Sequence, residues 1–218
     1  MPIAEEMRLA PLLVAIALAG IVASVAHAEA RPLTASDRAL LARSATYEEQ
    51  IGESVARRLT GHTVAVRCGA LGVADPRILG VTPFSATGPV DYFLMRPAEC
   101  TYLAWFRQAP ARWDPRACTA EDCSRVASIV TSLAVVAHES YHILGYSNEA
   151  QVECYGMQSI WFVAHKLGAP VAEAQALAGM YAARTYPLRR TQTPAYWSAE
   201  CRDGGAYDLR RSLARWPS

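Results

Sequence analysis

Lysine is almost absent from this chain of 218 residues: Lys166 is the only one, and arginine supplies the other basic side chains. Neither charge sign is in excess, because 21 basic residues stand against 20 acidic ones and the formal net charge is +1. The chain therefore lacks the basic surplus with which many proteins bind phosphate backbones, and we expect no nucleic-acid partner. Internal repeats and low-complexity segments are also lacking, and 52% hydrophobic with 19% charged residues is typical of a globular chain.

The first 28 residues have the pattern of an export signal. Arg8 precedes an apolar run at 9–25, and Ala26-His27-Ala28 follows that run. A basic residue, an apolar segment and a small-x-small sequence are the three parts of a secretory signal peptide. We therefore expect cleavage after residue 28, which leaves Glu29 as the first residue of the mature chain.

The alternative interpretation of this segment is an uncleaved N-terminal membrane anchor. Residues 9–28 are about long enough to span a bilayer. With either interpretation, residues 29–218 are expected to form one domain outside the cytoplasm, which is extracellular or attached to the cell surface.

Six cysteines follow the proposed cleavage site. An even number of cysteines in an exported chain predicts three disulfides, although the sequence does not determine their pairing. Cys118 and Cys123 enclose only the sequence TAED and could close a small loop. A C-x2-C pair, which is typical of zinc fingers, is absent. The candidate disulfide cysteines are Cys68, Cys100, Cys118, Cys123, Cys154 and Cys201.

The hydrophobic pattern of the first half predicts a helix and a small sheet. Residues 36–60 have the apolar spacing of one helix, which Gly61 would end. Residues 63–68 and 90–95 have the composition of strands, and 100–106 fits either a third strand or a short helix. We expect an α+β domain whose small sheet is antiparallel.

The second half is expected to be helical. Ser124 would cap a helix over 125–144, and this helix is apolar almost all round. Such a helix is expected to lie buried at the centre of the fold. Asn148 would cap the next helix, over 149–167, and Pro170 would open a third.

The central helix carries the motif H-E-x-x-H at His138, Glu139 and His142. Residues four apart lie on the same face of a helix, so both imidazoles can bind one zinc ion. The glutamate beside the first histidine can then act as a general base toward the attacking water. The simpler alternative is a pair of hydrogen-bonded core histidines, although burying these groups without partners would be costly.

A zinc site of this kind needs a third protein ligand. Asn148 stands where a metzincin would have its third histidine. Glu149 and Glu153 share one face of the following helix, so one can bind zinc while the other accepts a hydrogen bond from a histidine. The alternative is a solvated acidic first turn, which the helix dipole favours.

H-E-x-x-H followed by a helix with E-x-x-x-E resembles the gluzincin group of metallopeptidases. The resemblance implies a zincin-like fold, a zinc cofactor, and hydrolysis of peptide or other amide bonds in peptide or protein substrates. It also implies that Glu149 is the ligand and Glu153 its support. Six residues separate His142 from Glu149, fewer than gluzincins usually have, so Glu153 remains an alternative ligand. The stretches 138–158 and 196–209 also resemble small exported proteins of actinobacteria.

Hydrolysis would also need a donor to the oxyanion, and the sequence does not single one out. Because no donor stands out, a non-catalytic zinc-binding or interaction protein on the same scaffold remains the alternative function. Arg189 belongs to a basic tail that we expect to be a solvated face. The candidate donors are His165, Tyr155, Tyr181, Tyr186 and Tyr196.

Overall fold

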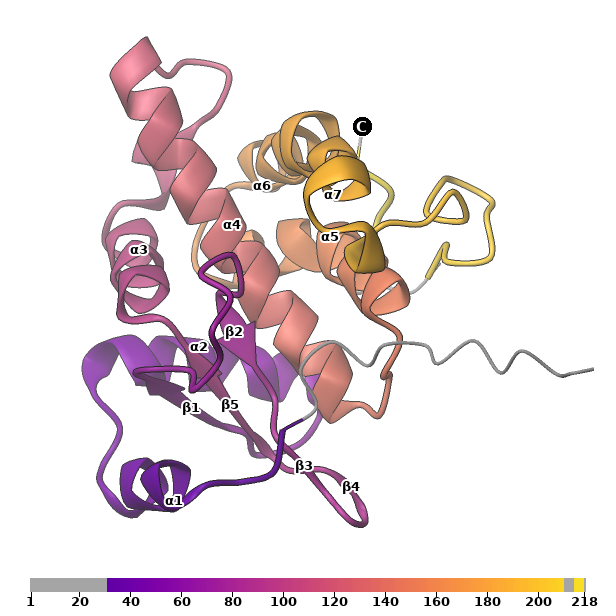
Figure 1. The fold of residues 1–218 in the computed structure, drawn as a ribbon. Helices are drawn as coiled ribbons and strands as arrows, with labels where there is room; N and C mark the ends of the chain where they lie inside the picture. The colour runs from indigo at the N-terminus through magenta and orange to yellow at the C-terminus, as the bar shows by residue number, and fades with distance from the viewer. Residues whose placement is uncertain (1–30, 210–213, 218) are drawn as a thin grey trace, which may run out of the picture.

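The computed structural model describes residues 31–209 and 214–217, so the proposed export signal lies outside the described residues. Figure 1 shows α4 crossing the middle of the molecule, with α2, α3 and the sheet on one side and α5 to α7 on the other. The elements are α1 (Ala35–Ala42), α2 (Tyr47–Thr60), β1 (Ala65–Cys68), β2 (Gly80–Val81), β3 (Phe84–Ser85), β4 (Gly88–Pro89), β5 (Tyr92–Met95), α3 (Pro97–Gln108), η1 (Pro110–Trp113), α4 (Ala120–Ile143), α5 (Glu149–Lys166), α6 (Val171–Met180), the π-helical turn η2 (Tyr181–Thr185), α7 (Tyr186–Gln192) and η3 (Pro194–Tyr196).

The segment predicted as one N-terminal helix forms two helices, α1 and α2. Thr34 caps α1 and Thr46 caps α2, and each side chain accepts a hydrogen bond from the amide of the residue three positions later. The carboxylates of those residues, Asp37 and Glu49, accept hydrogen bonds from the threonine amides in return. The second of these capping boxes starts a new helix, which explains the break. Gly61 ends α2 with φ 76°, as predicted.

The three-stranded sheet is mixed, so the prediction of an antiparallel sheet was wrong. β5 is its central strand, with β1 parallel on one side and β2 antiparallel on the other. Parallel strands need a long crossover, and the chain between Cys68 and Tyr92 is long enough to provide one. All four residues of β5 are buried, which explains its continuous apolar run.

The helices after the sheet differ from the predictions mainly at their starts. The segment 100–106 is helical and lies within α3, which has Pro97 in its first turn. Thr119 caps α4 in place of Ser124, so this helix begins earlier than predicted. Asn148 caps α5 as predicted, because its side chain accepts a hydrogen bond from an amide in the first turn. Within the described ranges, none of the helices combines the length and apolar character needed to cross a membrane.

The six cysteines form three disulfides, as predicted, and the predicted small loop is one of them. One disulfide joins β1 to α3, and another joins α5 to the segment that follows η3. Disulfides of this kind indicate an oxidising environment. The pairs are Cys68–Cys100, Cys118–Cys123 and Cys154–Cys201.

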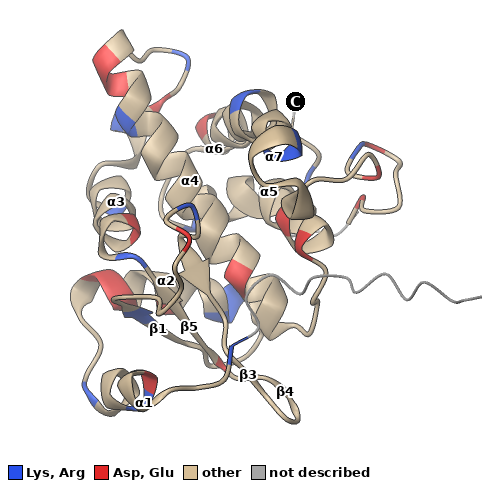
Figure 2. Cartoon of the chain, viewed as in Figure 1, with Lys and Arg blue, Asp and Glu red and all other residues tan. Residues whose placement is uncertain are grey.

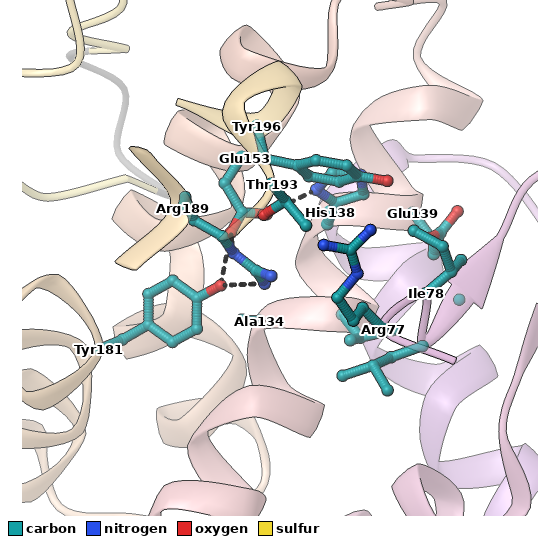
Figure 3. Close-up of a pocket in the computed structure, with 13 residues that line it drawn as sticks. Arg77, Ile78, Ala134, His138, Glu139, Glu153, Tyr181, Arg189, Thr193 and Tyr196 are labelled. Carbon is teal, nitrogen blue, oxygen red and sulfur yellow. Dashed lines mark hydrogen bonds and ion pairs between the residues drawn. The ribbon is translucent and has the colours of Figure 1, made fainter. Parts of the chain in front are cut away.

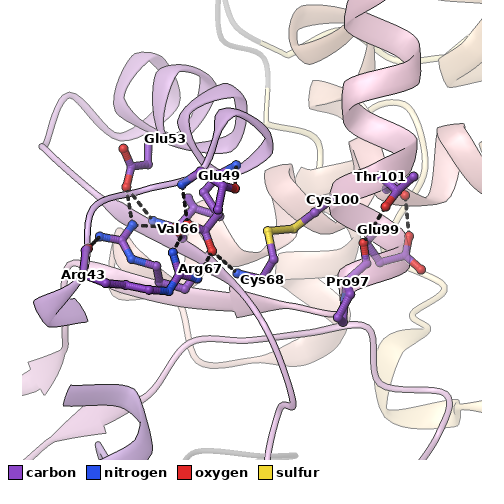
Figure 4. The surroundings of a disulfide bond; sticks show 12 residues. Arg43, Glu49, Glu53, Val66, Arg67, Cys68, Pro97, Glu99, Cys100 and Thr101 are labelled. Carbon is purple, nitrogen blue, oxygen red and sulfur yellow. Dashed lines mark hydrogen bonds and ion pairs between the residues drawn. A yellow bond between two sulfur atoms is a disulfide. The ribbon is translucent and has the colours of Figure 1, made fainter. Parts of the chain in front are cut away.

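A network of ionic hydrogen bonds surrounds the first disulfide (Figure 4). Glu49 accepts a hydrogen bond of 2.8 Å from the amide of Cys68 and a bidentate pair from Arg43. Burial alone would raise the pKa of Glu49, but the hydrogen bonds from Arg43 and from backbone amides lower it. Glu49, the carboxylate of the α2 capping box, therefore also anchors β1.

Candidate metal centre

The two helices that carry the predicted site form a tight hairpin. α4 ends at Ile143 and α5 begins at Glu149. Gly145 adopts φ 92° in the turn between them, a conformation that few other residues tolerate. Short connections make helices antiparallel neighbours, and in the described chain α4 makes its most extensive helix contact with α5. Figure 2 shows acidic residues on α5 beside α4, in the middle of the molecule.

Gly156 lets the two helices approach closely at the first histidine of the motif. A Cβ atom at this position would meet the backbone nitrogen of His138 at 3.1 Å and its Cα atom at 3.3 Å. These are tight contacts with backbone atoms, which cannot rotate away. The glycine therefore sets the spacing that brings the carboxylates of α5 to the imidazoles of α4.

His138, His142 and Glu149 are brought together by the hairpin, and all three are buried. The Nε2 atom of His138 lies 3.1 Å from Nε2 of His142 and 3.1 Å from Oε2 of Glu149. The third distance, from Nε2 of His142 to the same oxygen, is 3.5 Å. Ligand atoms around a tetrahedral ion at about 2.0–2.1 Å lie about 3.3–3.4 Å from one another. The three distances fall on either side of that spacing, so the cluster could hold a metal ion.

Both imidazoles use their other nitrogen for a hydrogen bond. Nδ1 of His138 lies 3.0 Å from Oε2 of Glu153, and Nδ1 of His142 lies 2.8 Å from the carbonyl oxygen of Tyr146. A carboxylate or a carbonyl can only accept, so each Nδ1 carries the proton. In the neutral rings, the lone pair is then on Nε2. Two such lone pairs and a carboxylate oxygen converge on one point, which requires a proton or a cation between them.

The charges of the cluster follow from its hydrogen bonds. Burial alone would lower the pKa of His138, but its hydrogen bonds to Glu149 and Glu153 raise it to about 10. Burial alone would raise the pKa of Glu149, but its hydrogen bonds to both histidines lower it to about 2. Without a metal ion, His138 therefore holds a proton between two carboxylates, and a metal ion would have to displace that proton.

Glu153 is held by two residues from the segment that follows α6. The hydroxyl of Tyr181 donates to its Oε1 atom at 2.6 Å, and Nε of Arg189 donates to the same oxygen at 2.8 Å. Burial would raise the pKa of Glu153, but the charge of Arg189 and the hydrogen bond to His138 lower it to about 2. The prediction that Arg189 lies on a solvated face was therefore wrong. Its guanidinium pairs with this buried carboxylate (Figure 3).

Glu139 lies beside the cluster and is oriented by the strand side of the fold. The hydroxyl of Thr82 donates to its Oε2 atom at 2.7 Å, and both residues are buried. Burial raises the pKa of Glu139. A pocket adjoins it, with Arg77 and Ile78 on the sheet side and Tyr196 among the residues on the opposite side (Figure 3).

Two of the five candidate oxyanion donors, Tyr181 and Tyr196, line this pocket. The ring of Tyr196 stacks on that of His138 with centroids 5.6 Å apart. Its hydroxyl is directed toward the side where Glu139 lies (Figure 3). The proton of Tyr181 is committed to Glu153.

The other three candidates have partners elsewhere. Tyr155 accepts a hydrogen bond from Gln151, and Tyr186 donates to a backbone carbonyl. Nδ1 of His165 lies 2.9 Å from the carbonyl oxygen of Ala169, at the far end of α5. None of the three is among the residues that line the described pocket.

Sequence reasoning missed four residues of this site. Thr82 and Arg189 carry no local signal, because their partners lie 57 and 36 positions away. Gly156 did carry one, since a glycine inside a helix usually marks a close approach. Gly80 lies against Glu139 and is the fourth.

Comparison of the chain with protein-family models, with curated proteins and with solved structures gives no match in any of the three. The resemblance to gluzincins therefore rests on the sequence motif and on the His138–His142–Glu149 cluster.

Proposed function

We propose that this protein is an exported zinc-dependent hydrolase of peptide or other amide bonds. The observation that carries the proposal is the convergence of two Nε2 atoms and one carboxylate oxygen at distances of 3.1 to 3.5 Å, close to the spacing around a tetrahedral ion. Two histidines and one glutamate are a donor set found in catalytic zinc sites, where the fourth position stays open. Calcium and magnesium, in contrast, prefer oxygen ligands, so the donor set favours zinc over them.

In this proposal His138, His142 and Glu149 hold the zinc ion, and Glu153 orients His138 without binding the metal. The bond from Glu153 to Nδ1 supports this assignment, because metal-bound histidines commonly donate their other N–H to a carboxylate or carbonyl. His142 has the same arrangement, because its Nδ1 faces the backbone carbonyl of Tyr146.

Zinc bound in such a site would supply Lewis acidity, which would activate water and polarise a carbonyl group. Glu139 takes the proton of the attacking water and passes it to the leaving amine. Its burial supports this role, because a raised pKa brings a carboxylate closer to the pH at which it can both accept and release a proton. We assign Tyr196 as the donor to the oxyanion, since its hydroxyl is directed toward the side of Glu139.

Export is part of the proposal because two features agree. Residues 1–28 have the composition of a signal peptide, and the described chain contains three disulfides, which are rare in reducing compartments.

Replacement of Glu139 by glutamine tests the reaction separately from the metal. An amide cannot accept the proton of water, so Glu139→Gln should keep its zinc and lose hydrolysis of a peptide library. Glu121→Gln, which changes a carboxylate that is 89% exposed on α4, is the matched control and should retain both. Unchanged turnover in zinc-replete Glu139→Gln would exclude the general-base role.

A non-catalytic zinc-binding protein on the same scaffold is the alternative. The commitment of the Tyr181 hydroxyl to Glu153 favours it, because this proton donor is not available to an oxyanion. The alternative predicts zinc binding by the wild-type protein without cleavage of any peptide in the library.

A further inference from the structure

We propose that strand β2 and the residue after it position the general base, with Thr82 fixing one oxygen of Glu139 and Gly80 leaving room for the other. The inference rests on the proposed function of Glu139. It adds two positioning residues that act through this carboxylate and contact no zinc ligand in the described contacts.

Thr82 fixes the oxygen Oε2. Its hydroxyl has a single proton, and Oε2 at 2.7 Å is a closer acceptor than the backbone oxygen of Glu139 at 3.3 Å. Thr82 is 3% exposed and Glu139 is 4% exposed, so water competes little for this hydrogen bond. A buried hydrogen bond to a carboxylate is among the stronger kinds in proteins.

Gly80 provides the space for the oxygen Oε1. A Cβ atom at position 80 would lie 2.6 Å from Oε1 and 2.9 Å from Cγ of Glu139, and 2.8 Å from Cγ1 of Val135. Real Cβ atoms do not approach other atoms so closely, and the added carbon would clash with Val135 as well as with Glu139. Glycine is therefore required here for space.

The two contacts give the two oxygens different tasks. With Oε2 held by Thr82, Oε1 is the oxygen that lies against Gly80, and both Gly80 and Glu139 line the pocket. A general base must lie within hydrogen-bond reach of the proton that it takes. Pairing of β2 with β5, Gly80 opposite Met95, fixes the strand that carries these residues.

Replacement of Thr82 by valine tests the hydrogen bond, since valine keeps the shape of threonine and removes the hydroxyl. We expect Thr82→Val to bind one zinc per chain and to lower kcat about 100-fold with little change in KM, as expected for a misplaced catalytic group. Thr82→Ser keeps the hydroxyl and should restore most of kcat. Thr60→Val, which removes another buried threonine hydroxyl that donates to a backbone carbonyl, is the matched control and should keep wild-type kcat.

Replacement of Gly80 by alanine tests the space in the same way. Gly80→Ala should lower kcat by a similar factor, about 100-fold, while zinc remains bound. Gly69→Ala is its control, because a Cβ atom at position 69 meets nothing closer than 3.4 Å.

A second readout does not depend on turnover. The carboxyl carbon of Glu139 can be observed by 13C NMR in zinc-loaded protein, with its signal assigned by its loss in Glu139→Gln. Thr82→Val and Gly80→Ala should shift this signal, whereas Thr60→Val and Gly69→Ala should not. If the wild-type protein hydrolyses no peptide, the proposed function fails, and the NMR shift still decides whether these residues position Glu139. The inference is overturned if Thr82→Val and Gly80→Ala match their controls in the NMR signal, or in kcat where the wild-type protein is active.

Discussion

The Nδ1 atom of His138 lies 3.0 Å from Oε2 of Glu153. Glu153 therefore faces the nitrogen opposite the one that converges with His142 and Glu149, and the two glutamates of α5 have different roles. In the proposed zinc site, loss of Glu149 would remove a ligand, whereas loss of Glu153 would remove a partner of a ligand. We expect Glu153→Gln to weaken zinc binding about 10–100-fold and Glu149→Gln to weaken it more.

Zinc affinity measured by competition with a chelator distinguishes the two roles. Glu121→Gln serves as the control, because it removes a carboxylate that is exposed and far along α4 from the cluster. A larger loss of affinity in Glu153→Gln than in Glu149→Gln would reverse the assignment and make Glu153 the ligand.

Gly156 should be intolerant of even a methyl group. In Gly156→Ala the added carbon would press on the backbone of His138 at 3.1 Å, which pushes α5 away from α4. We expect a loss of about 1–3 kcal/mol in the free energy of unfolding, as for overpacked cores. Zinc affinity should also fall, because both glutamates lie on the displaced helix. Urea denaturation and chelator competition measure the two effects. Wild-type values for both would show that this contact does not set the spacing between α4 and α5.

Zinc binding should strengthen as the pH rises. The carboxylates of Glu149 and Glu153 hold the pKa of His138 well above neutrality in the metal-free protein, so this imidazole is protonated at pH 6 to 8. Zinc needs the neutral ring and must release that proton. Glu149 is already ionised in this pH range, so zinc binding releases no proton from it. We therefore expect apparent affinity to rise about tenfold per pH unit between pH 6 and 8. An affinity independent of pH, after correction for the chelator, would show that His138 is neutral without metal.

The exported protein should be shorter than the full chain and fully oxidised. Cleavage after residue 28 would remove the first 28 residues, and three disulfides would remove six hydrogens. Intact-mass measurement under non-reducing conditions tests both parts. Recovery of the uncleaved chain in the membrane fraction would support the anchor instead, and reaction of two or more thiols in denaturant would contradict the disulfides.

Local patterns predicted the helices of the site well. The motif at residues 138–142 and the cap at Asn148 are contiguous features, so the sequence was sufficient to place them on α4 and α5. The loop between Cys118 and Cys123 was predictable for the same reason.

Long-range relationships were not predictable. Whether β1 pairs parallel or antiparallel with β5 depends on the route of the connecting chain, which hydrophobic alternation does not record. Arg189 looked like a surface residue because its partner, Glu153, lies three helical segments earlier in the chain. Thr82 lies just after an edge strand, and only the packing of that strand on α4 brings its hydroxyl to Glu139.

Zinc stoichiometry of the purified mature chain tests the central claim most directly. The account predicts one zinc per chain in wild-type protein and a large loss of bound zinc in His142→Ala, because Nε2 of His142 is one of the three converging atoms. His62→Ala, which changes a histidine on the surface beside Asp91, should keep one zinc. Less than about 0.2 zinc per wild-type chain after metal loading, against the one expected for a structural or catalytic site, would contradict the account.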